Sequence, residues 1–375
     1  MWCTSAKTYI LRVCEKIETL MGWKLRTFTS PERPNYHPEL DVSDLLDLDG
    51  VSKYRMLIGS MNWVVILGRF DVCFTTQNFA RYSAVPREEQ MNALERVFGY
   101  LKAYAKFSII YDARMPDVSA YYISKYDWFR SYPDAKEELP PDMPAPRGNP
   151  VRILGFFDAS HASCLQTRRS VTGVLMFVNR TPIMWYSKRQ ATVETSTYGS
   201  ELVAGRIACE LGIDLRYRLR MLGVPVLGSC LMFGDNQSMV TNVTVPGSPL
   251  KKRSLAIAYH RVRECIAAGI VDIVHCPTEY NLADLMTKSL GPQVFQRLTH
   301  NIAFPPSSTT LLKNGELNET TKKTSQKTRQ DSVKLNRLRL DYSRYGDGTF
   351  CPVRDVAEAL SDDLFFHYLA KSHME

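Results

Sequence analysis

Residues 151–190 read VRILGFFDASHASCLQTRRSVTGVLMFVNRTPIMWYSKRQ, and this stretch decides the fold class of the region around it. It contains three apolar runs of strand length, at 151–158, 170–178 and 182–187. Residues 179–181 form a short polar turn between the last two runs. The stretch therefore predicts three consecutive strands joined as a meander.

The residues after this meander alternate between helical and strand patterns. The predicted helices cover 197–222, 236–242, 256–268 and 281–290, and the predicted strands cover 229–234 and 270–275. Strands separated by helices are joined by crossover connections, which favour parallel pairing. Residues 151–298 are therefore predicted to form an α/β domain. Its mixed five-stranded sheet is antiparallel at first and parallel afterwards, with helices on both faces.

The region before this domain, residues 1–115, is predicted to be mainly helical. Apolar residues recur at helical spacing, and a short strand-like run closes the region. The predicted helices cover 7–21, 53–68, 71–83 and a fourth segment opened by Pro86, and the predicted strand covers 108–111.

Two regions are predicted to be irregular. Residues 116–150 form a linker or insert, and its last part, EELPPDMPAPRGNP, carries five prolines without a period. Its aromatic residues are expected to dock on a neighbouring domain, and they are Tyr121, Tyr122, Tyr126, Trp128 and Phe129. Residues 299–375 form a low-order tail, with disorder expected at 305–330 and a short helix at 353–369.

The composition of the 375 residues limits the class of protein. Hydrophobic residues make up 45% and charged residues 23%, which is typical of globular domains. The net charge of +8 fits a nucleic-acid partner without requiring one. No apolar run is long enough to span a membrane, and the N-terminus lacks a signal-peptide pattern. We therefore expect an intracellular protein, cytoplasmic or nuclear, that is not secreted. Nine scattered cysteines without a C-x-x-C pair predict neither a disulfide framework nor a zinc site.

Four acidic residues of the predicted α/β domain are candidates for chemistry. Asp158 and Asp235 end apolar strand patterns, Glu201 lies early in the long helix, and Asp284 lies in the last helix. Parallel strands end at the same edge of a sheet, so the two strand-end carboxylates are expected to converge there. Convergent carboxylates with no Lys or Arg beside them in the sequence suit Mg²⁺ or Mn²⁺. The structural alternative is capping, with Asp235 as the N-cap of the next helix.

Seven motifs together resemble a known family. They are GFFDAS, RRSVTG, WYSKRQ, ETSTYGSELVA, GDNQS, AYHRVRE and NLADLMTKSLGP. In this order and spacing they resemble the ribonuclease H domain of copia-type LTR retrotransposon polyproteins. Residues 52–104, from SKYRMLIGSMNWVVILG to ERVFGYLKAY, resemble the end of the reverse transcriptase region that precedes that domain. Residues 1–115 are thereby interpreted as a partial thumb and connection.

The resemblance implies a nuclease that hydrolyses the RNA strand of an RNA·DNA hybrid with two Mg²⁺ ions, or with Mn²⁺. It implies that Asp158 and Asp235 bridge the ions, and that Glu201 and Asp284 each complete one site. The Y-x-D-D motif of reverse transcriptases is absent, so no polymerase activity is expected. The partners implied are the hybrid and the rest of a polyprotein.

Candidate substrate contacts are polar and basic residues near the expected site. Asn236 and Gln237 open a helix, where backbone N–H groups and amides can meet a nucleic-acid backbone. The others lie in or beside turns and loops, and they are Arg168, Arg169, Ser170, Lys188, Lys251 and Lys252. The plainer interpretation of such clusters is a solvated basic surface.

The sequence departs from the family pattern at two places. Copia-type chains often read S-T-x-E-A-E-Y, and Gly199 replaces the first Glu here, which leaves Glu201 as the candidate ligand. Other ribonucleases H carry a mobile His before the last Asp, whereas Glu279 is nearest to that place in this chain. His275 is expected to be packed on the last strand.

Two alternative functions are left open by the sequence. One is a catalytically inactive retroelement remnant that keeps the fold and at most binds nucleic acid. The other is an integrase- or resolvase-like nuclease, which would also use three or four carboxylates. Enzymes of the transposase type carry their Glu on a late helix, so Glu201 on the first long helix favours the ribonuclease H interpretation.

Overall fold

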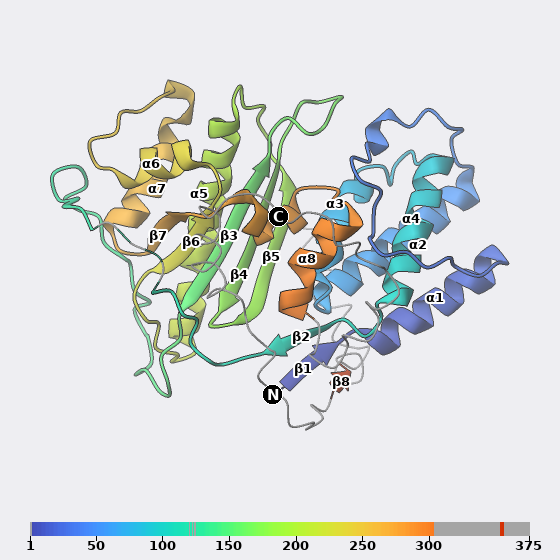
Figure 1. The fold of residues 1–375 in the computed structure, drawn as a ribbon, viewed down its shortest axis with the longest axis horizontal. Helices are drawn as coiled ribbons and strands as arrows, with labels where there is room; N and C mark the ends of the chain where they lie inside the picture. The colour runs from blue at the N-terminus through green and yellow to red at the C-terminus, as the bar shows by residue number, and fades with distance from the viewer. Residues whose placement is uncertain (1, 120, 122, 124, 304–352, 356–375) are drawn as a thin grey trace, which may run out of the picture. The chain divides into compact units, whose positions relative to one another are not determined.

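The structure is a computed structural model that describes residues 2–119, 121, 123, 125–303 and 353–355 (Figure 1). These residues divide into two compact units, 2–111 with 290–303 and 353–355, and 112–289. Among them, no helix combines the length and the apolar character that a membrane crossing needs.

The second unit is built on a five-stranded mixed sheet. Its strands are β3 (Ile153–Ser160), β4 (Val171–Val178), β5 (Thr181–Arg189), β6 (Cys230–Gly234) and β7 (Val271–His275). Their order across the sheet is β5-β4-β3-β6-β7 (Figure 1). The first three strands pair antiparallel, whereas β6 runs parallel to β3 and β7. This confirms the fold class expected from the sequence.

The α-helices of this unit cover one face of the sheet, and the 3-10 helix η5 (Leu282–Met286) packs on the other. The α-helices are α5 (Thr197–Met221), α6 (Gln237–Thr244) and α7 (Ala256–Ala267), which follows the 3-10 helix η3 (Arg253–Leu255). Helix α5 packs on β3 and β4, and α7 packs on α5 and β7. The core between them is apolar, because every second residue of β3, such as Phe157 and Ala159, faces the helices.

Two successive 3-10 helices lie here, and the second replaces the helix that the sequence predicts at 281–290. They are η4 (Thr278–Tyr280) and η5 (Leu282–Met286), and η5 packs against β3, β4 and β5. The α-helix does not form because the sheet uses the backbone groups of this turn. Ser187 Oγ donates to Met286 O at 2.7 Å, a carbonyl that a continuing helix would have paired internally.

The insert before the sheet is fastened to the second unit. Arg216 of α5 donates to both oxygens of Glu137, each at 2.7 Å, and Arg220 also pairs with Glu137. Tyr121 packs edge-on to Phe233.

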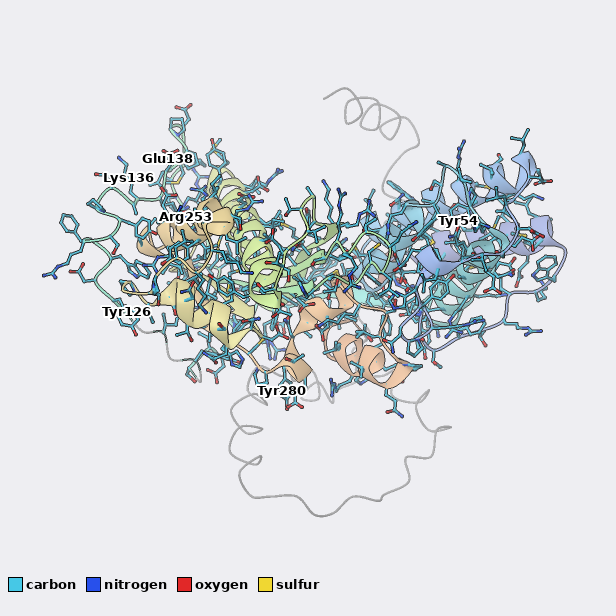
Figure 2. The ribbon with its side chains drawn as sticks, turned by 90° about the horizontal axis from the view of Figure 1, so that it is seen from above. Tyr54, Tyr126, Lys136, Glu138, Arg253 and Tyr280 are labelled. Atoms are coloured by element: carbon cyan, nitrogen blue, oxygen red, sulfur yellow. The ribbon has the colours of Figure 1, made fainter. Side chains whose placement is uncertain are left out.

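The aromatic residues of the insert are divided between packed and exposed positions. The guanidinium of Arg263 lies 4.9 Å from the Trp128 ring centre. Tyr126 and Phe129, by contrast, are exposed (Figure 2 labels Tyr126), and Tyr122 lies outside the described residues.

The first unit is mainly helical, as predicted. Its elements are β1 (Trp2–Ser5), α1 (Lys7–Met21), η1 (Pro38–Leu40), α2 (Leu48–Ile66), η2 (Phe70–Val72), α3 (Cys73–Ala80), α4 (Glu88–Ala103), β2 (Ser108–Tyr111), α8 (Pro292–Ala303) and β8 (Val353–Asp355). Helix α2 begins before the predicted residue 53 because Asp47 caps it and accepts from Gly50 N at 2.7 Å.

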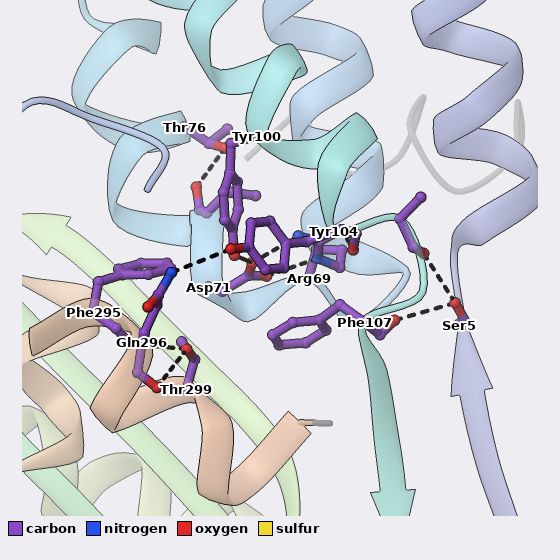
Figure 3. A network of polar contacts seen from close by, with 12 residues as sticks. Ser5, Arg69, Asp71, Thr76, Tyr100, Tyr104, Phe107, Phe295, Gln296 and Thr299 are labelled. Carbon is purple, nitrogen blue, oxygen red and sulfur yellow. Dashed lines mark hydrogen bonds and ion pairs between the residues drawn. The ribbon is translucent and has the colours of Figure 1, made fainter. Parts of the chain in front are cut away.

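A buried ion pair organises the core of this unit. Arg69 donates to both oxygens of Asp71, at 2.9 and 2.8 Å, and Tyr100 donates to Asp71 at 2.6 Å (Figure 3). The centre of the Phe107 ring lies 4.6 Å from the guanidinium carbon of Arg69. Both charges are fully enclosed, and each is paired and hydrogen-bonded, as a buried ion pair requires.

Three elements of this unit correct the sequence interpretation. The predicted limit at residue 298 falls inside α8, whose Phe295 packs edge-on to Tyr100 at 5.5 Å. Strand β1 was not predicted. Strand β8 pairs parallel to β1, and it contains the first three residues of the segment 353–369 that is expected to be helical. The other calls for the tail concern residues 304–352 and 356–375, which lie outside the described residues.

Candidate active site

Asp158 lies inside β3, two residues before its observed end at Ser160, whereas the sequence predicts that the strand ends at Asp158. It is opposite Gly173 of β4, and its side chain is buried on the face that η5 covers. The hydroxyl of Thr287, which follows η5, donates to Asp158 Oδ2. The strand extends past Asp158 because Ala159 and Ser160 continue the pairing with β4.

Three of the four predicted carboxylates converge around this position. One oxygen from each of Asp158, Asp235 and Asp284 lies within 4.8 Å of the others. Asp235 directly follows β6, which neighbours β3, and Asp284 is carried by η5. The cluster is therefore produced by the parallel pairing of two strands and by the packing of one short turn on the sheet.

Glu201 of α5 lies beside the cluster, although it is not one of those three residues. It is 6% exposed, and its carboxylate accepts a hydrogen bond from the backbone of Ala159. Its Oε2 atom is buried and has no hydrogen-bond partner. Burial, and then the charges of Asp158 and Asp235, raise the pKa of Glu201 well above its ordinary value.

The pKa values of Asp284 and Asp235 are also raised. Burial and the Asp158 charge raise the pKa of Asp284 to about 7. Burial and the same charge raise the pKa of Asp235. Burial is the largest cause of each shift, and the negative charge of the neighbouring carboxylates adds to it.

Lys288 is the residue of this site that sequence reasoning missed. Its Nζ lies 2.6 Å from Asp284 Oδ1 and 3.3 Å from Asp158 Oδ2. No Lys or Arg stands beside Asp158 or Asp235 in the sequence, and Lys288 reaches the site from a distant segment. The available signal was the spacing, since Lys288 follows Asp284 by four residues, at which side chains of a helical turn are neighbours.

A set of neutral contacts holds η5 against the sheet. Asn281, which is fully buried, donates to Phe157 O at 3.0 Å and accepts from Ala283 N at 3.1 Å. Gly173 permits the close approach, because a Cβ there would lie 2.5 Å from Thr287 Cγ2 and 2.6 Å from Met286 Cβ. These residues place Asp284 beside Asp158.

The predicted substrate contacts are not all available to a ligand. Ser170 is fully buried, and its hydroxyl accepts from Ala162 N at 3.0 Å, so it shapes the turn. Asn236 is the N-cap of α6 and accepts from Met239 N.

The predicted basic contacts fall into two groups. Lys251 donates to Ser238 at 2.7 Å and Lys252 donates to Ser196 at 2.9 Å, so both tie their loop to helix N-termini. The exposed candidates are Arg168, Lys188 and Gln237, and Arg169 is half-buried.

The segment before Asp284 makes one contact that the sequence does not predict. His275 is half-buried on β7 and its Nε2 lies 3.1 Å from Asp235 O, so it contacts the backbone of a candidate ligand. Thr278 hydrogen-bonds the Asp235 side chain. Glu279 is exposed.

The donor set fits hard divalent cations. All four candidate ligands are carboxylates, which Mg²⁺ and Mn²⁺ prefer. The buried, unpartnered Oε2 of Glu201 is a lone acceptor that a cation would satisfy. Once ionised, four carboxylates beside one ammonium leave an excess of negative charge, which suits a cation of charge +2 or more.

The chain is similar in sequence to retrotransposon polyproteins. It is 22% identical over 309 residues to the retrovirus-related Pol polyprotein from transposon RE1 of Arabidopsis thaliana, covering 81% of this chain and 18% of that protein. With the corresponding polyprotein from transposon RE2 of the same plant it shares 24% over 276 residues, 72% of this chain and 16% of that protein. The chain thus spans less than a fifth of these relatives. They confirm the predicted resemblance.

The solved structures that resemble the chain include a ribonuclease H1. The enzyme from Halobacterium salinarum matches 36% of this chain and 94% of its own, with 17% identity and a TM-score of 0.28. No protein-family model matches the chain.

Proposed function

We propose that the second unit is a nuclease of the ribonuclease H type, which hydrolyses the RNA strand of RNA·DNA hybrids. The observation that carries the proposal is the carboxylate cluster, with Asp158, Asp235 and Asp284 within 4.8 Å and Glu201 beside them. The strand order of the sheet and the retrotransposon relatives support the same assignment.

The four carboxylates would act as metal ligands rather than as proton carriers. The charge of Asp158 acts on each of the other three carboxyl groups, and Asp158 would be shared by two cations, as would Asp235. Glu201 and Asp284 approach from α5 and η5 and would complete the two sites. Two bound Mg²⁺ ions would supply an activated water and stabilise the leaving 3′ oxygen. The chain itself fixes the ligands, because Asn281 and Thr287 hold η5 to β3.

A hybrid would be held by basic and polar groups on the same unit. Lys188 is an exposed candidate near the end of β5; it lies in register with Thr172 and Ala159, a row that faces the helices rather than the side of Asp158. Arg168 and Gln237 are exposed and are further candidates. Their side chains are expected to contact phosphates and 2′-hydroxyl groups.

The test is cleavage of a hybrid whose RNA strand is labelled, using the full chain with Mg²⁺ and then with Mn²⁺. We expect fragments of the RNA strand and an intact DNA strand. Asp158→Asn and Asp235→Asn each remove a shared ligand, so each is expected to abolish cleavage. Asp214→Asn is the matched control, because Asp214 is exposed on α5 and pairs with Arg218.

Each outcome separates the candidate functions. RNA cleavage that survives in both active-site variants would refute the assignment. A folded protein that binds the hybrid without cleaving it would support the inactive remnant instead. Cleavage of DNA duplexes in preference to hybrids would favour an integrase-like nuclease.

A further inference from the structure

The ammonium of Lys288 contacts two carboxylates of the cluster, those of Asp158 and Asp284. It contacts Asp284 at 2.6 Å and lies 3.3 and 3.4 Å from the two oxygens of Asp158. In the described part of the chain, these two aspartates form ion pairs with Lys288 and with no other Lys or Arg. Lys288 is thus the cation that balances the cluster in this structure.

We propose that Lys288 is a built-in counter-ion that competes with the divalent cation shared by Asp158 and Asp284. The inference rests on the proposed function, because it takes these carboxylates to be metal ligands. It assigns to Lys288 two opposite effects. The residue stabilises the metal-free protein, and it weakens the binding of metal.

The competition follows from the oxygens that both cations need. Mg²⁺ binds carboxylate oxygens at about 2.0–2.1 Å, and Asp158 and Asp284 already direct theirs at the ammonium. A cation held by the same oxygens would lie only a few ångströms from Nζ, where like charges repel strongly in a buried site. The ammonium must therefore leave as that cation enters.

The side chain has room to leave. Lys288 is 35% exposed, whereas Asp158 is 2% exposed, so the lysine connects the buried cluster to solvent. Its stem is flexible and can carry the charge outward without moving the backbone. The ligands, by contrast, are fixed by Asn281 and Thr287.

The experiment measures metal binding and stability without substrate. The full-length wild type, Lys288→Met and Lys288→Arg are titrated with MgCl₂ by calorimetry, and their thermal unfolding is followed in EDTA. Lys288→Met is expected to bind Mg²⁺ about tenfold more tightly or better, a factor that corresponds to about 1.4 kcal/mol. It should also unfold at a lower temperature in EDTA. Lys288→Arg, which keeps the charge, should stay close to wild type in affinity.

A control separates this effect from loss of charge in general. Lys136 is exposed in the insert (Figure 2), so Lys136→Met removes one charge from the same unit and should leave Mg²⁺ affinity unchanged. If Lys288→Met does not stay folded in EDTA, the Mg²⁺ concentration that restores half of the folded circular-dichroism signal replaces calorimetry. Recovery of that signal at a Mg²⁺ concentration below the wild-type Kd for Mg²⁺ supports the inference.

Several results would overturn the proposal. Mg²⁺ affinity that is equal or weaker in Lys288→Met contradicts competition, and so does unchanged unfolding in EDTA. Absence of Mg²⁺ binding in all variants overturns both the counter-ion role and the metal centre. Metal binding that follows the expected pattern in a protein that cleaves no hybrid leaves Lys288 as the counter-ion and refutes only the nuclease.

Discussion

Replacing Gly173 by Ala tests how the candidate site is assembled. Gly173 is opposite Asp158 in the sheet, and η5 packs directly over it. An added Cβ would lie 2.5 Å from Thr287 Cγ2, 2.6 Å from Met286 Cβ and 2.9 Å from Ala283 O. Two of these atoms are a backbone oxygen and a Cβ, which cannot move by rotation of a side chain. The turn itself must therefore shift away from β4.

The substitution is expected to lower both the stability and the activity of the protein. Overpacking of this kind costs about 1–3 kcal/mol in free energy of unfolding. For a unit of this size, that lowers the unfolding midpoint by about 2–12 °C. The shift also moves Asp284, which η5 carries, relative to Asp158. Displacement of a catalytic group by about 1 Å lowers activity by roughly a hundredfold.

The assay combines thermal unfolding in EDTA with calorimetric titration of Mg²⁺. Gly247→Ala is the matched control, because Gly247 belongs to the same unit and a Cβ there meets nothing within 4 Å. It should unfold within about 0.5 kcal/mol of wild type. If Gly173→Ala unfolds like this control and binds Mg²⁺ with wild-type affinity, the close approach of η5 to the sheet does not position Asp284.

Three further predictions concern the second unit. Burial opposes ionisation of Glu137, but hydrogen bonds from Arg216 and Arg220 lower its pKa to about 2. Glu137→Gln should therefore reduce the free energy of unfolding at pH 7 by about 2–3 kcal/mol. In urea titrations this difference should disappear as the pH falls from about 4.5 to about 2, and a difference that persists at the lowest pH would contradict the ion pair. Asn281→Ala removes two buried hydrogen bonds and should cost about 1–3 kcal/mol by urea unfolding, with weaker Mg²⁺ binding; unchanged values would exclude Asn281 as a positioning residue. Mg²⁺ at a hundred times its Kd should stabilise the wild type by about 2.7 kcal/mol in thermal scans, and an equal gain in Asp158→Asn would place the metal elsewhere.

Much of the second unit could be predicted because its signals are local. The apolar runs around Phe157, Leu175 and Met232 each form one strand, and the predicted ends differ from the observed ones by few residues. Chain order and the crossover rule then give the pairing of the sheet. The same logic placed Asp158 and Asp235 at the ends of two strands, since each ends an apolar run, and the structure makes those strands neighbours.

What the sequence left open depends on contacts between distant residues. Lys288 is 130 positions from Asp158, and only the packing of η5 brings its ammonium to that carboxylate. The helix α8 joins the first unit because Phe295 meets Tyr100, far earlier in the chain. The sequence determined which segments form strands and helices, because apolar periodicity is set by neighbouring residues. The tertiary structure decided which charges meet, because that depends on how separate segments pack, and local periodicity carries no information about it.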